Sequence, residues 1–322
     1  MTSTAAQLAA AVDALVRGEL VAFPTETVYG LGARADDDAA VARIFAAKGR
    51  PAEHPLIVHV ADAAAASAFS VALPASAVRL MEAFWPGPLT LIVPRRPGVA
   101  GAAAAGQASI GLRLPSHPLA LALLRGAADQ GVPGVAAPSA NRFGRVSATS
   151  SAHVRAEFGA ALHVLDGGAC EVGIESAIVD CTRAPPALLR PGQLARARIE
   201  AALGQRLAER DALSPRASGT LASHYAPAAT LRLWPSDELA ARVGRPPSLA
   251  EQGIGVYSRR APGAGWTHRP MPADASAAAH ELFAALRWFD DAGAGTVWIE
   301  QVPADAAWDG VRDRLMRAAA AS

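Results

Sequence analysis

Apolar residues recur along the first two-thirds of the chain with two spacings, one typical of strands and the other of helices. Short apolar runs predict strands at 20–23, 56–60, 89–93, 109–114, 132–136, 174–179 and 187–189. Helical spacing predicts helices near 8–17, 41–45, 62–70, 75–84, 117–128, 151–158 and 193–203. Asp36 is the expected N-cap of the second helix, and Gly49 and Pro51 are expected to end it. Because strands and helices alternate irregularly, the pattern predicts an α/β domain with a mixed, twisted sheet.

The apolar pattern is lost between 205 and 227, where Ser, Gly and Pro become frequent, and it then restarts. Strands are predicted at 231–234, 254–257 and 297–300, and helices at 280–290 and 308–320. The sequence therefore predicts a larger domain at 1–205, a linker at 206–228 and a smaller βαβ-type domain at 229–322.

The composition of the chain excludes several classes of protein. The 322 residues carry 30 Lys+Arg against 29 Asp+Glu, and a net charge of +1 argues against a chain-wide nucleic-acid scaffold, although a local basic groove stays possible. Two cysteines cannot build a disulfide framework or a Cys-rich zinc site. The N-terminal segment lacks a basic n-region, and no run approaches ~20 uncharged apolar residues. We therefore expect a protein of a reducing compartment, the cytoplasm, without a membrane span.

Lys48 is the single lysine of the chain, against 29 arginines. It begins the turn Lys48-Gly49-Arg50 at the end of a predicted helix, where any cation would favour the helix dipole by ~0.3–1 kcal/mol. A lysine also offers phosphate a compact point charge, which arginine does not. Because the chain otherwise uses arginine, the exception favours phosphate binding over simple capping.

Further polar residues stand at strand ends. The segment 24–32 (PTETVYGLG) and the segment 137–149 (APSANRFGRVSAT) both follow predicted strands and are rich in hydroxyl groups and glycine. Arg113 lies in an otherwise apolar strand and requires a carboxylate or phosphate, supplied either by the protein or by a ligand. The motifs GxxxxGK[ST], GxGxxG, GxSxG and HExxH are all missing from the sequence. The residues thus predict a pocket of cations and hydroxyls that binds an anionic, phosphorylated ligand and acts by positioning and charge.

Seven motifs in order resemble the Sua5/YrdC/YciO family over roughly residues 5–205: PTETVYGLGA, AKGRPAEHPLIVHV, WPGPLTLIV, GLRLP, APSANRFGRVSAT, IESAIVD and LLRPG. The segment SPRASGTLASHYAP resembles the linker of the Sua5 type, and the tail is similar to its C-terminal domain. The resemblance implies a YrdC-like α/β domain with a twisted mixed sheet, followed by a linker and a smaller Rossmann-like α/β Sua5 domain.

The resemblance also implies an activity: L-threonylcarbamoyladenylate synthesis, which forms threonylcarbamoyl-AMP and pyrophosphate from L-threonine, bicarbonate and ATP for the t6A modification of tRNA. Lys48 and Arg50 would be catalytic. The residues implied to hold L-threonine are Thr27, His59, Arg113, Ser139 and Ser176. Those implied to hold ATP are Arg50, His54, Ser109, Asn141, Thr149, Arg190 and Tyr225. Mg²⁺ would accompany ATP without dedicated protein ligands, and the product would pass to the tRNA threonylcarbamoyl-transfer machinery, with weak tRNA contact possible and no membrane partner.

Three other interpretations compete with this one. The first is a tRNA- or double-stranded-RNA-binding module without adenylate-forming activity, which Arg34, Arg142 and Arg145 would suit but the near-zero net charge does not favour. The second is carbamoyl transfer of the hydrogenase-maturation type, which needs Cys-rich zinc modules that two cysteines cannot supply. In the third, the C-terminal region is a regulatory or interaction module that gives the protein a non-enzymatic role.

Overall fold

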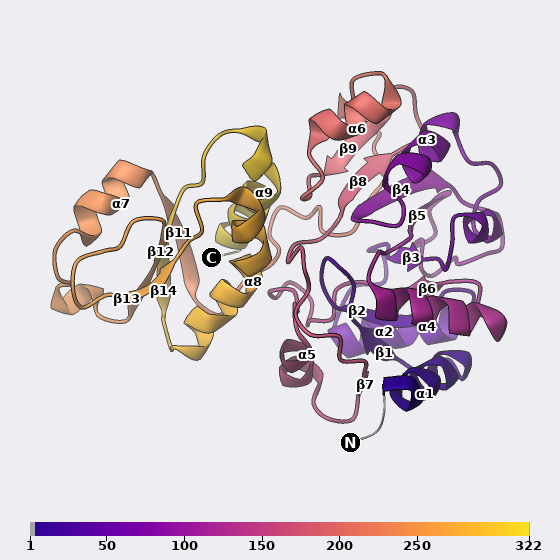
Figure 1. The fold of residues 1–322 in the computed structure, drawn as a ribbon, viewed down its shortest axis with the longest axis horizontal. Helices are drawn as coiled ribbons and strands as arrows, with labels where there is room; N and C mark the ends of the chain where they lie inside the picture. The colour runs from indigo at the N-terminus through magenta and orange to yellow at the C-terminus, as the bar shows by residue number, and fades with distance from the viewer. Residues whose placement is uncertain (1–3, 322) are drawn as a thin grey trace. The chain divides into compact units, whose positions relative to one another are not determined.

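The computed structural model describes residues 4–321, and the chain divides into two compact units (Figure 1). The first comprises the chain up to Phe143 together with Ser147–Thr220, and the second comprises Gly144–Val146 and the chain from Leu221. Within the second unit, Ala226 donates its backbone N–H to the Gly144 carbonyl at 2.8 Å. The division of the sequence into 1–205, 206–228 and 229–322 stays a prediction.

The described part of the first unit contains one ten-stranded mixed sheet, with the strand order β10-β9-β8-β4-β5-β3-β6-β2-β1-β7. Its strands are β1 (Val21–Phe23), β2 (Gly30–Arg34), β3 (Ile57–His59), β4 (Leu89–Pro94), β5 (Ser109–Arg113), β6 (Val135–Ala136), β7 (His163–Val164), β8 (Ala177–Asp180), β9 (Ala187–Arg190) and β10 (Ala208–Glu209). Its helices are α1 (Thr4–Val16), α2 (Asp38–Lys48), α3 (Ala75–Phe84), α4 (Pro118–Asp129), α5 (Ser151–Phe158) and α6 (Arg196–Leu203), with a 3₁₀ turn η1 (Ala64–Ala68).

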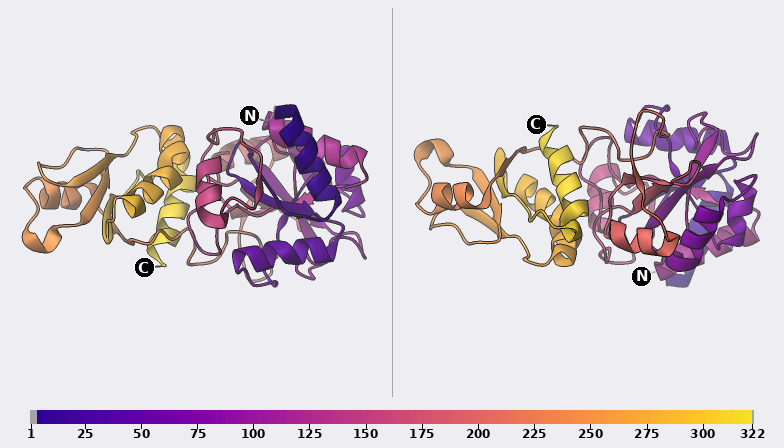
Figure 2. Two further views of the ribbon diagram at one scale, coloured as in Figure 1. Left: turned by 90° about the horizontal axis from the view of Figure 1, so that it is seen from below. Right: turned by 90° about the horizontal axis from the view of Figure 1, so that it is seen from above.

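Helices cover both faces of the sheet near β1, as Figure 2 shows. Successive strand residues point to opposite faces. Val21 and Phe23 therefore pack with Leu15 of α1 and Leu123 of α4, whereas Ala22 joins a second cluster that contains residues of α2 and α3. The alternation of apolar residues in β1 thus builds two separate cores from a single strand.

The other half of the sheet is covered differently. Leu91, Leu112 and Val179 belong to the core cluster that includes residues of α3 and α6. The residues that alternate with them in β4 and β8, Ile92 and Ile178, join Ile57 in a small cluster against which Ala217 packs, together with Ala208. No α-helical residue contributes to this small cluster among the described residues, so this face leaves room for polar side chains beside the isoleucines.

The described part of the second unit contains a four-stranded parallel sheet in the order β11-β14-β12-β13. Its elements are β11 (Thr230–Trp234), α7 (Ser236–Val243), η2 (Leu249–Glu251), β12 (Ile254–Ser258), β13 (Thr267–Pro270), α8 (Ala275–Asp291), β14 (Thr296–Glu300), η3 (Ala306–Trp308) and α9 (Asp309–Ala319). Leu239 of α7 packs with Val256 and Trp298, whereas the neighbouring Tyr257 meets Phe289 of α8, so helices cover both faces of this sheet. The predicted fold class, a mixed-sheet α/β domain followed by a smaller Rossmann-like one, is confirmed.

Several local predictions were wrong in position or type. The N-cap of α2 is Asp37, whose carboxylate accepts from the Ala39 and Ala40 amides, because Asp36 is paired with Arg34 at 2.7 Å. The helix predicted at 62–70 is the 3₁₀ turn η1, since its five residues Ala64–Ala68 are too few for a stable α-helix. No strand was predicted at 30–34, yet these residues form strand β2, which its pairing with β1 and β6 stabilises.

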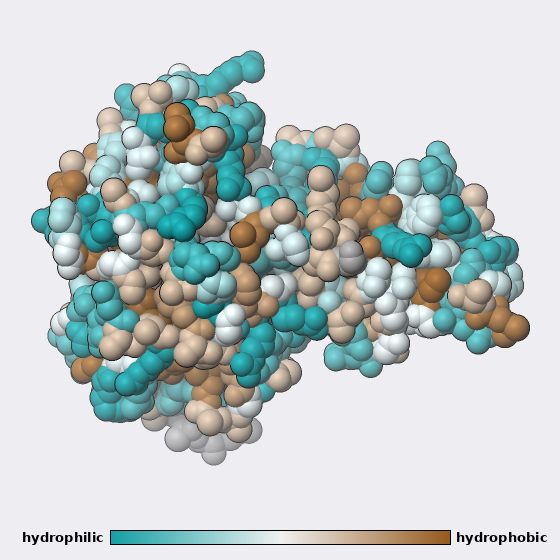
Figure 3. Space-filling model, turned by 180° about the vertical axis from the view of Figure 1, so that it is seen from behind, coloured by the Kyte–Doolittle hydropathy of each residue, from teal (hydrophilic) through white to brown (hydrophobic). Residues whose placement is uncertain are grey.

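On the face drawn in Figure 3, hydrophilic and hydrophobic residues are interspersed over each unit. Within residues 4–321, every helix is either too short or too polar to cross a bilayer. Cys170 and Cys181 are both buried and form no disulfide.

Candidate active site

Four neighbouring strands bring one polar side chain each to the face that carries Ile57, Ile92 and Ile178. They are His59 at the end of β3, Arg113 at the end of β5, Thr90 in β4 and Ser176 immediately before β8. His59, Thr90 and Ser176 each lie two residues from the isoleucine of their own strand, so they point to the same face as it does. Arg113 faces the same way because it is the register partner of His59. The sheet thus gathers groups that are far apart in the sequence.

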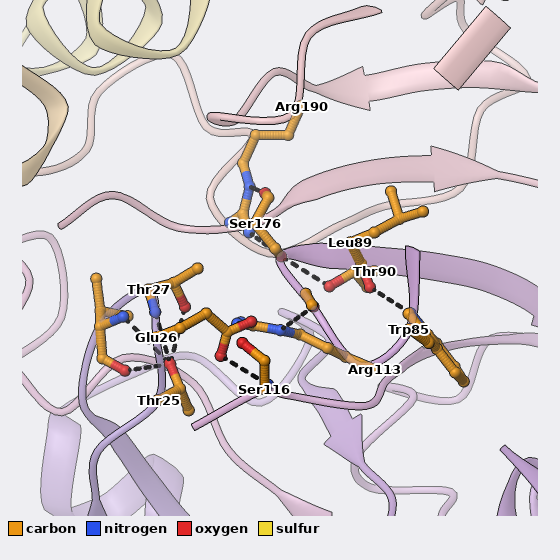
Figure 4. Close-up of polar contacts among 12 residues, drawn as sticks. Thr25, Glu26, Thr27, Trp85, Leu89, Thr90, Arg113, Ser116, Ser176 and Arg190 are labelled. Carbon is orange, nitrogen blue, oxygen red and sulfur yellow. Dashed lines mark hydrogen bonds and ion pairs between the residues drawn. The ribbon is translucent and has the colours of Figure 1, made fainter. Parts of the chain in front are cut away.

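A hydrogen-bonded chain runs along the first part of this row (Figure 4). The Oγ1 of Thr90 and the Oγ of Ser176 are 2.8 Å apart, and both residues are fully buried. Arg190, at the end of β9, donates from Nε to the Ser176 carbonyl at 3.0 Å and from Nη2 to its hydroxyl at 3.3 Å. The same guanidinium donates to the Ser218 carbonyl at 2.9 Å. Arg190 therefore holds together the start of β8 at Ser176 and the chain segment around Ser218.

Arg113 forms a buried ion pair with Glu26, in the loop between β1 and β2. Its Nη2 lies 2.7 Å from Glu26 Oε1, and both side chains are about 5% exposed or less. The Ser116 amide donates to Glu26 Oε2 at 3.1 Å, and Arg113 Nε donates to the Gly87 carbonyl at 3.4 Å. The sequence left open whether the protein or a ligand supplies the partner of Arg113, and the structure shows a protein carboxylate (Figure 4).

His59 is neutral in this site. Its burial, and secondarily the positive charge of Arg113, lower the pKa of His59 to about 3. Its ring stands edge-on to Phe23, with 6.0 Å between centroids, and its Nδ1 is buried without a hydrogen-bond partner. An uncharged imidazole nitrogen with spare hydrogen-bonding capacity is therefore present beside the guanidinium.

Thr27 lies in the same loop as Glu26 and is fully buried. Its Oγ1 is 2.8 Å from Thr25 Oγ1, and the Thr25 hydroxyl caps the turn by bonding the Val28 carbonyl at 2.6 Å. The backbone of the loop is tied down from outside, since Val172 and Gly173 donate to the Glu26 and Thr27 carbonyls. The loop thus presents one carboxylate and two hydroxyls from a fixed backbone.

Lys48 ends α2 and is only 3% exposed. Its Nζ donates to the Ser139 carbonyl at 2.6 Å and to the Asn141 carbonyl, and the Phe143 amide donates to the Lys48 carbonyl at 2.9 Å. Burial, and then the neighbouring Arg50, hold the pKa of Lys48 well below its usual value. Lys48 therefore ties the helix end to the loop that follows β6, a role that neither sequence interpretation of this residue contained.

Arg50 and His54 meet at Phe143. The Arg50 guanidinium carbon is 5.8 Å from the Phe143 ring centroid, and the His54 ring is 5.3 Å from it. Arg50 Nη2 donates to the Pro55 carbonyl at 3.0 Å, and burial together with Arg50 lowers the pKa of His54. With Ser139 and Asn141, the structure brings together five of the predicted residues around the end of α2.

Ser109 lies at the start of β5, in a small pocket that also contains Arg216, Ala217 and Ser218. The crossing segment is held by Gln107, whose amide donates to the Arg216 carbonyl at 3.2 Å and accepts from its N–H at 2.9 Å. Residues 216–218 therefore lie directly over a residue predicted to bind ATP.

Two predicted ATP residues have their observed contacts elsewhere. Thr149 bonds the ring of His153 through its backbone N–H at 3.2 Å. Tyr225 lies in the second unit with a φ of +65°, where its buried ring meets Phe283 and the Arg314 guanidinium, each at 5.4 Å. Their assignment to ATP stays a prediction, as does the rest of the site list.

Sequence reasoning missed two members of this site, Glu26 and Thr90. Glu26 stood inside the quoted PTETVYGLG segment, and its need for a partner mirrors that of Arg113, so the two could have been paired with each other. Thr90 interrupts an apolar strand, which was the available signal. Within residues 4–321, no three His, Cys, Asp or Glu side chains gather in a way that would hold a metal ion.

Comparison with known proteins places both parts of the chain. A family model for Sua5, YciO and YrdC proteins, described as telomere recombination, matches residues 13–192. A second model, described as the C-terminal domain of threonylcarbamoyl-AMP synthase, matches residues 194–320.

Individual relatives agree with the family models. A threonylcarbamoyl-AMP synthase of Bacillus subtilis is 37% identical over 97% of this chain and 93% of its own length. The protein of the same name from Schizosaccharomyces pombe is 34% identical, over 93% and 84% respectively. The crystal structure of P. abyssi Sua5 complexed with L-threonine is 34% identical and matches with a TM-score of 0.89, over 100% of this chain and 96% of that one. The resemblance read from the seven motifs is confirmed.

Proposed function

The chain belongs to the Sua5/YrdC/YciO family, and from that premise we propose that it is an L-threonylcarbamoyladenylate synthase. It would combine L-threonine, bicarbonate and ATP into threonylcarbamoyl-AMP, pyrophosphate and water. The observation that carries the proposal is the row of buried polar groups on one sheet face. Relatives that carry this enzyme's name and match the chain over most of their own length support it. The RNA-binding alternative is not favoured, because these relatives are named as synthases.

The amino acid would occupy the end of the row at Arg113. A guanidinium recognises a carboxylate by paired, charge-assisted hydrogen bonds, so Arg113 would hold that of threonine. Thr27, His59, Ser139 and Ser176 would offer the neutral donors and acceptors that a hydroxyl and an amine require. The threonine complex solved for P. abyssi Sua5 supports an amino-acid site of this kind.

The nucleotide would lie along Arg50, His54, Ser109, Asn141, Thr149 and Arg190, with Tyr225 also assigned to it. In the chemical step, a carbamate oxygen formed from threonine and bicarbonate attacks the α-phosphorus of ATP, and the bond to pyrophosphate breaks. Negative charge grows on the phosphate oxygens, and the cations Lys48, Arg50 and Arg190 would offset it without a covalent enzyme intermediate. Lys48 would do so while holding the Ser139–Asn141 backbone in place.

Mg²⁺ would enter with the phosphates of ATP, where it adds to the charge neutralisation. We further propose that the protein works in the cytoplasm, which two free, buried cysteines support, and that its product passes to the machinery that modifies tRNA.

The test is to incubate the protein with ATP, L-threonine and bicarbonate and to measure pyrophosphate while each substrate is omitted in turn. We expect release only when all three are present. Pyrophosphate that forms equally without threonine or without bicarbonate would refute the proposal, and tRNA binding with no turnover would favour the RNA-binding alternative.

A further inference from the structure

We propose that Glu26 binds the ammonium group of the amino-acid substrate, so that the buried Glu26–Arg113 pair exchanges its mutual contact for the two charges of a zwitterion. This inference rests on the proposed function and adds to it a residue and a basis of selectivity. It starts from the ion pair itself, whose atoms Arg113 Nη2 and Glu26 Oε1 are 2.7 Å apart.

Stability gives no strong reason for this pair. Moving two charges out of water costs several kcal/mol per ion, and the attraction between them often does no more than offset that cost. An apolar pair of similar volume would serve a purely structural role as well. The side chains of this pair are at most 5% exposed and lie beside buried hydroxyl groups. A ligand that carries both charges therefore explains the pair better than stability does.

Each half of the pair also has its own anchor. Glu26 Oε2 accepts from the Ser116 amide at 3.1 Å, so the carboxylate keeps its position when Oε1 changes partner. Arg113 Nε donates to the Gly87 carbonyl at 3.4 Å, which does the same for the guanidinium. Figure 4 shows Glu26 and Arg113 facing each other, with Ser116 beside the carboxylate and Thr25 and Thr27 in the adjoining loop. The two groups can therefore separate slightly around a ligand without losing their orientation.

The neighbouring titratable groups do not compete for either charge. Burial lowers the pKa of His59 to about 3 and raises that of Cys170 to about 12, so both are neutral at pH 7. Burial also lowers the pKa of His117, which leaves its ring neutral as well. A free amino acid brings one positive and one negative charge on the same carbon, and this matches Glu26 and Arg113 one to one.

The pairing predicts how the site rejects wrong ligands. A ligand with a carboxylate but no ammonium would occupy Arg113 and leave the Glu26 charge buried with fewer partners. A ligand with an ammonium but no carboxylate would do the converse to Arg113. Because an uncompensated buried charge is costly, both should bind more weakly than the zwitterion.

Calorimetric titration with three ligands tests this without turnover: L-threonine, threoninol, which lacks the carboxylate, and the α-hydroxy analogue of threonine, which lacks the amine. Wild-type protein should bind threonine at least about tenfold more tightly than either analogue. Glu26→Gln should remove most of the preference over the hydroxy analogue while keeping the preference over threoninol. Arg113→Gln should do the opposite.

The matched control is Glu300→Gln in the second unit. Glu300 is 3% exposed, against 4% for Glu26, and is likewise paired with an arginine, Arg259 at 2.6 Å, so its loss removes a comparable buried carboxylate. We expect this variant to rank the three ligands as wild type does.

Parallel weakening of all three ligands in Glu26→Gln would overturn the proposal and assign Glu26 a purely structural role. If that variant does not fold, wild type alone still decides, since equal binding of threonine and the hydroxy analogue would also overturn it. Either of these two results would leave the proposed function intact, provided that the wild-type protein makes pyrophosphate from threonine. Absence of both threonine binding and turnover would instead refute the function.

Discussion

Gly192 lies two residues beyond Arg190, the last residue of β9, and packs against the backbone that carries Ser176. A Cβ at this position would lie 2.4 Å from the Ala177 nitrogen and 2.9 Å from the Ser176 carbonyl carbon. Comfortable contacts between heavy atoms are ~3.5–4.0 Å. Gly192→Ala must therefore push two backbone segments apart by about 1 Å, and no flexible side chain can absorb the shift.

The displaced segments carry Ser176 of the polar row and Arg190, which donates to it, so this substitution should harm activity more than stability. Overpacking costs typically ~1–3 kcal/mol, which would lower the Tm of the first unit by roughly 2–12 °C. A displacement of 1 Å at a reacting centre costs about 10²-fold in rate. We therefore expect a folded protein whose pyrophosphate release, measured as kcat/KM for threonine, falls about 100-fold.

Gly101→Ala is the matched control, because a Cβ there has its nearest neighbour, Asp38 Oδ2, at 3.6 Å. Both variants are assayed at saturating ATP, with circular dichroism melts of the same samples. Gly101→Ala should match wild type in both. The reasoning is refuted if Gly192→Ala retains kcat/KM within about twofold of wild type, since the row would then tolerate the shift.

Three further predictions concern Lys48, His59 and Gln107. Lys48→Arg, which keeps the charge, should lower pyrophosphate release at least about tenfold, because a planar fork cannot replace an ammonium shared by the Ser139 and Asn141 carbonyls; full activity would contradict this. The pKa of His59 is about 3 when folded and ~6.5 when unfolded, so the unfolded chain binds the extra proton and stability falls as pH drops below ~6.5. Urea titrations should show a loss at pH 4 of about 3 kcal/mol that is missing in His59→Gln, and equal pH dependence of the two proteins would count against it. Gln107→Ala removes both side-chain bonds to Arg216, so limited trypsin digestion should cleave after Arg216 faster than in wild type. An unchanged rate would show that the Ser218 bond to Arg190 and the packing of Ala217 hold the segment without Gln107.

Much of the fold could be predicted from the sequence, because alternation and helical spacing are local properties of the chain. The two α/β parts and most strands of the second unit were found in this way. The errors arose where tertiary pairing decides the outcome. Residues 30–34 were not predicted as a strand, yet they form strand β2, because β1 on one side and β6 on the other supply hydrogen-bond partners.

The sequence by itself determined which residue types the chemistry needs: a guanidinium in an apolar strand, one lysine among arginines, and hydroxyls at strand ends. It could not determine their partners, since a partner is a neighbour in space and not in the chain. Strand order alone brings Ser176 beside Thr90, 86 positions apart, and places Arg113 beside His59. Only the tertiary structure shows that Arg113 is paired with Glu26 and that Lys48 holds two carbonyls, because burial makes each charge take whatever opposite dipole or charge the fold provides.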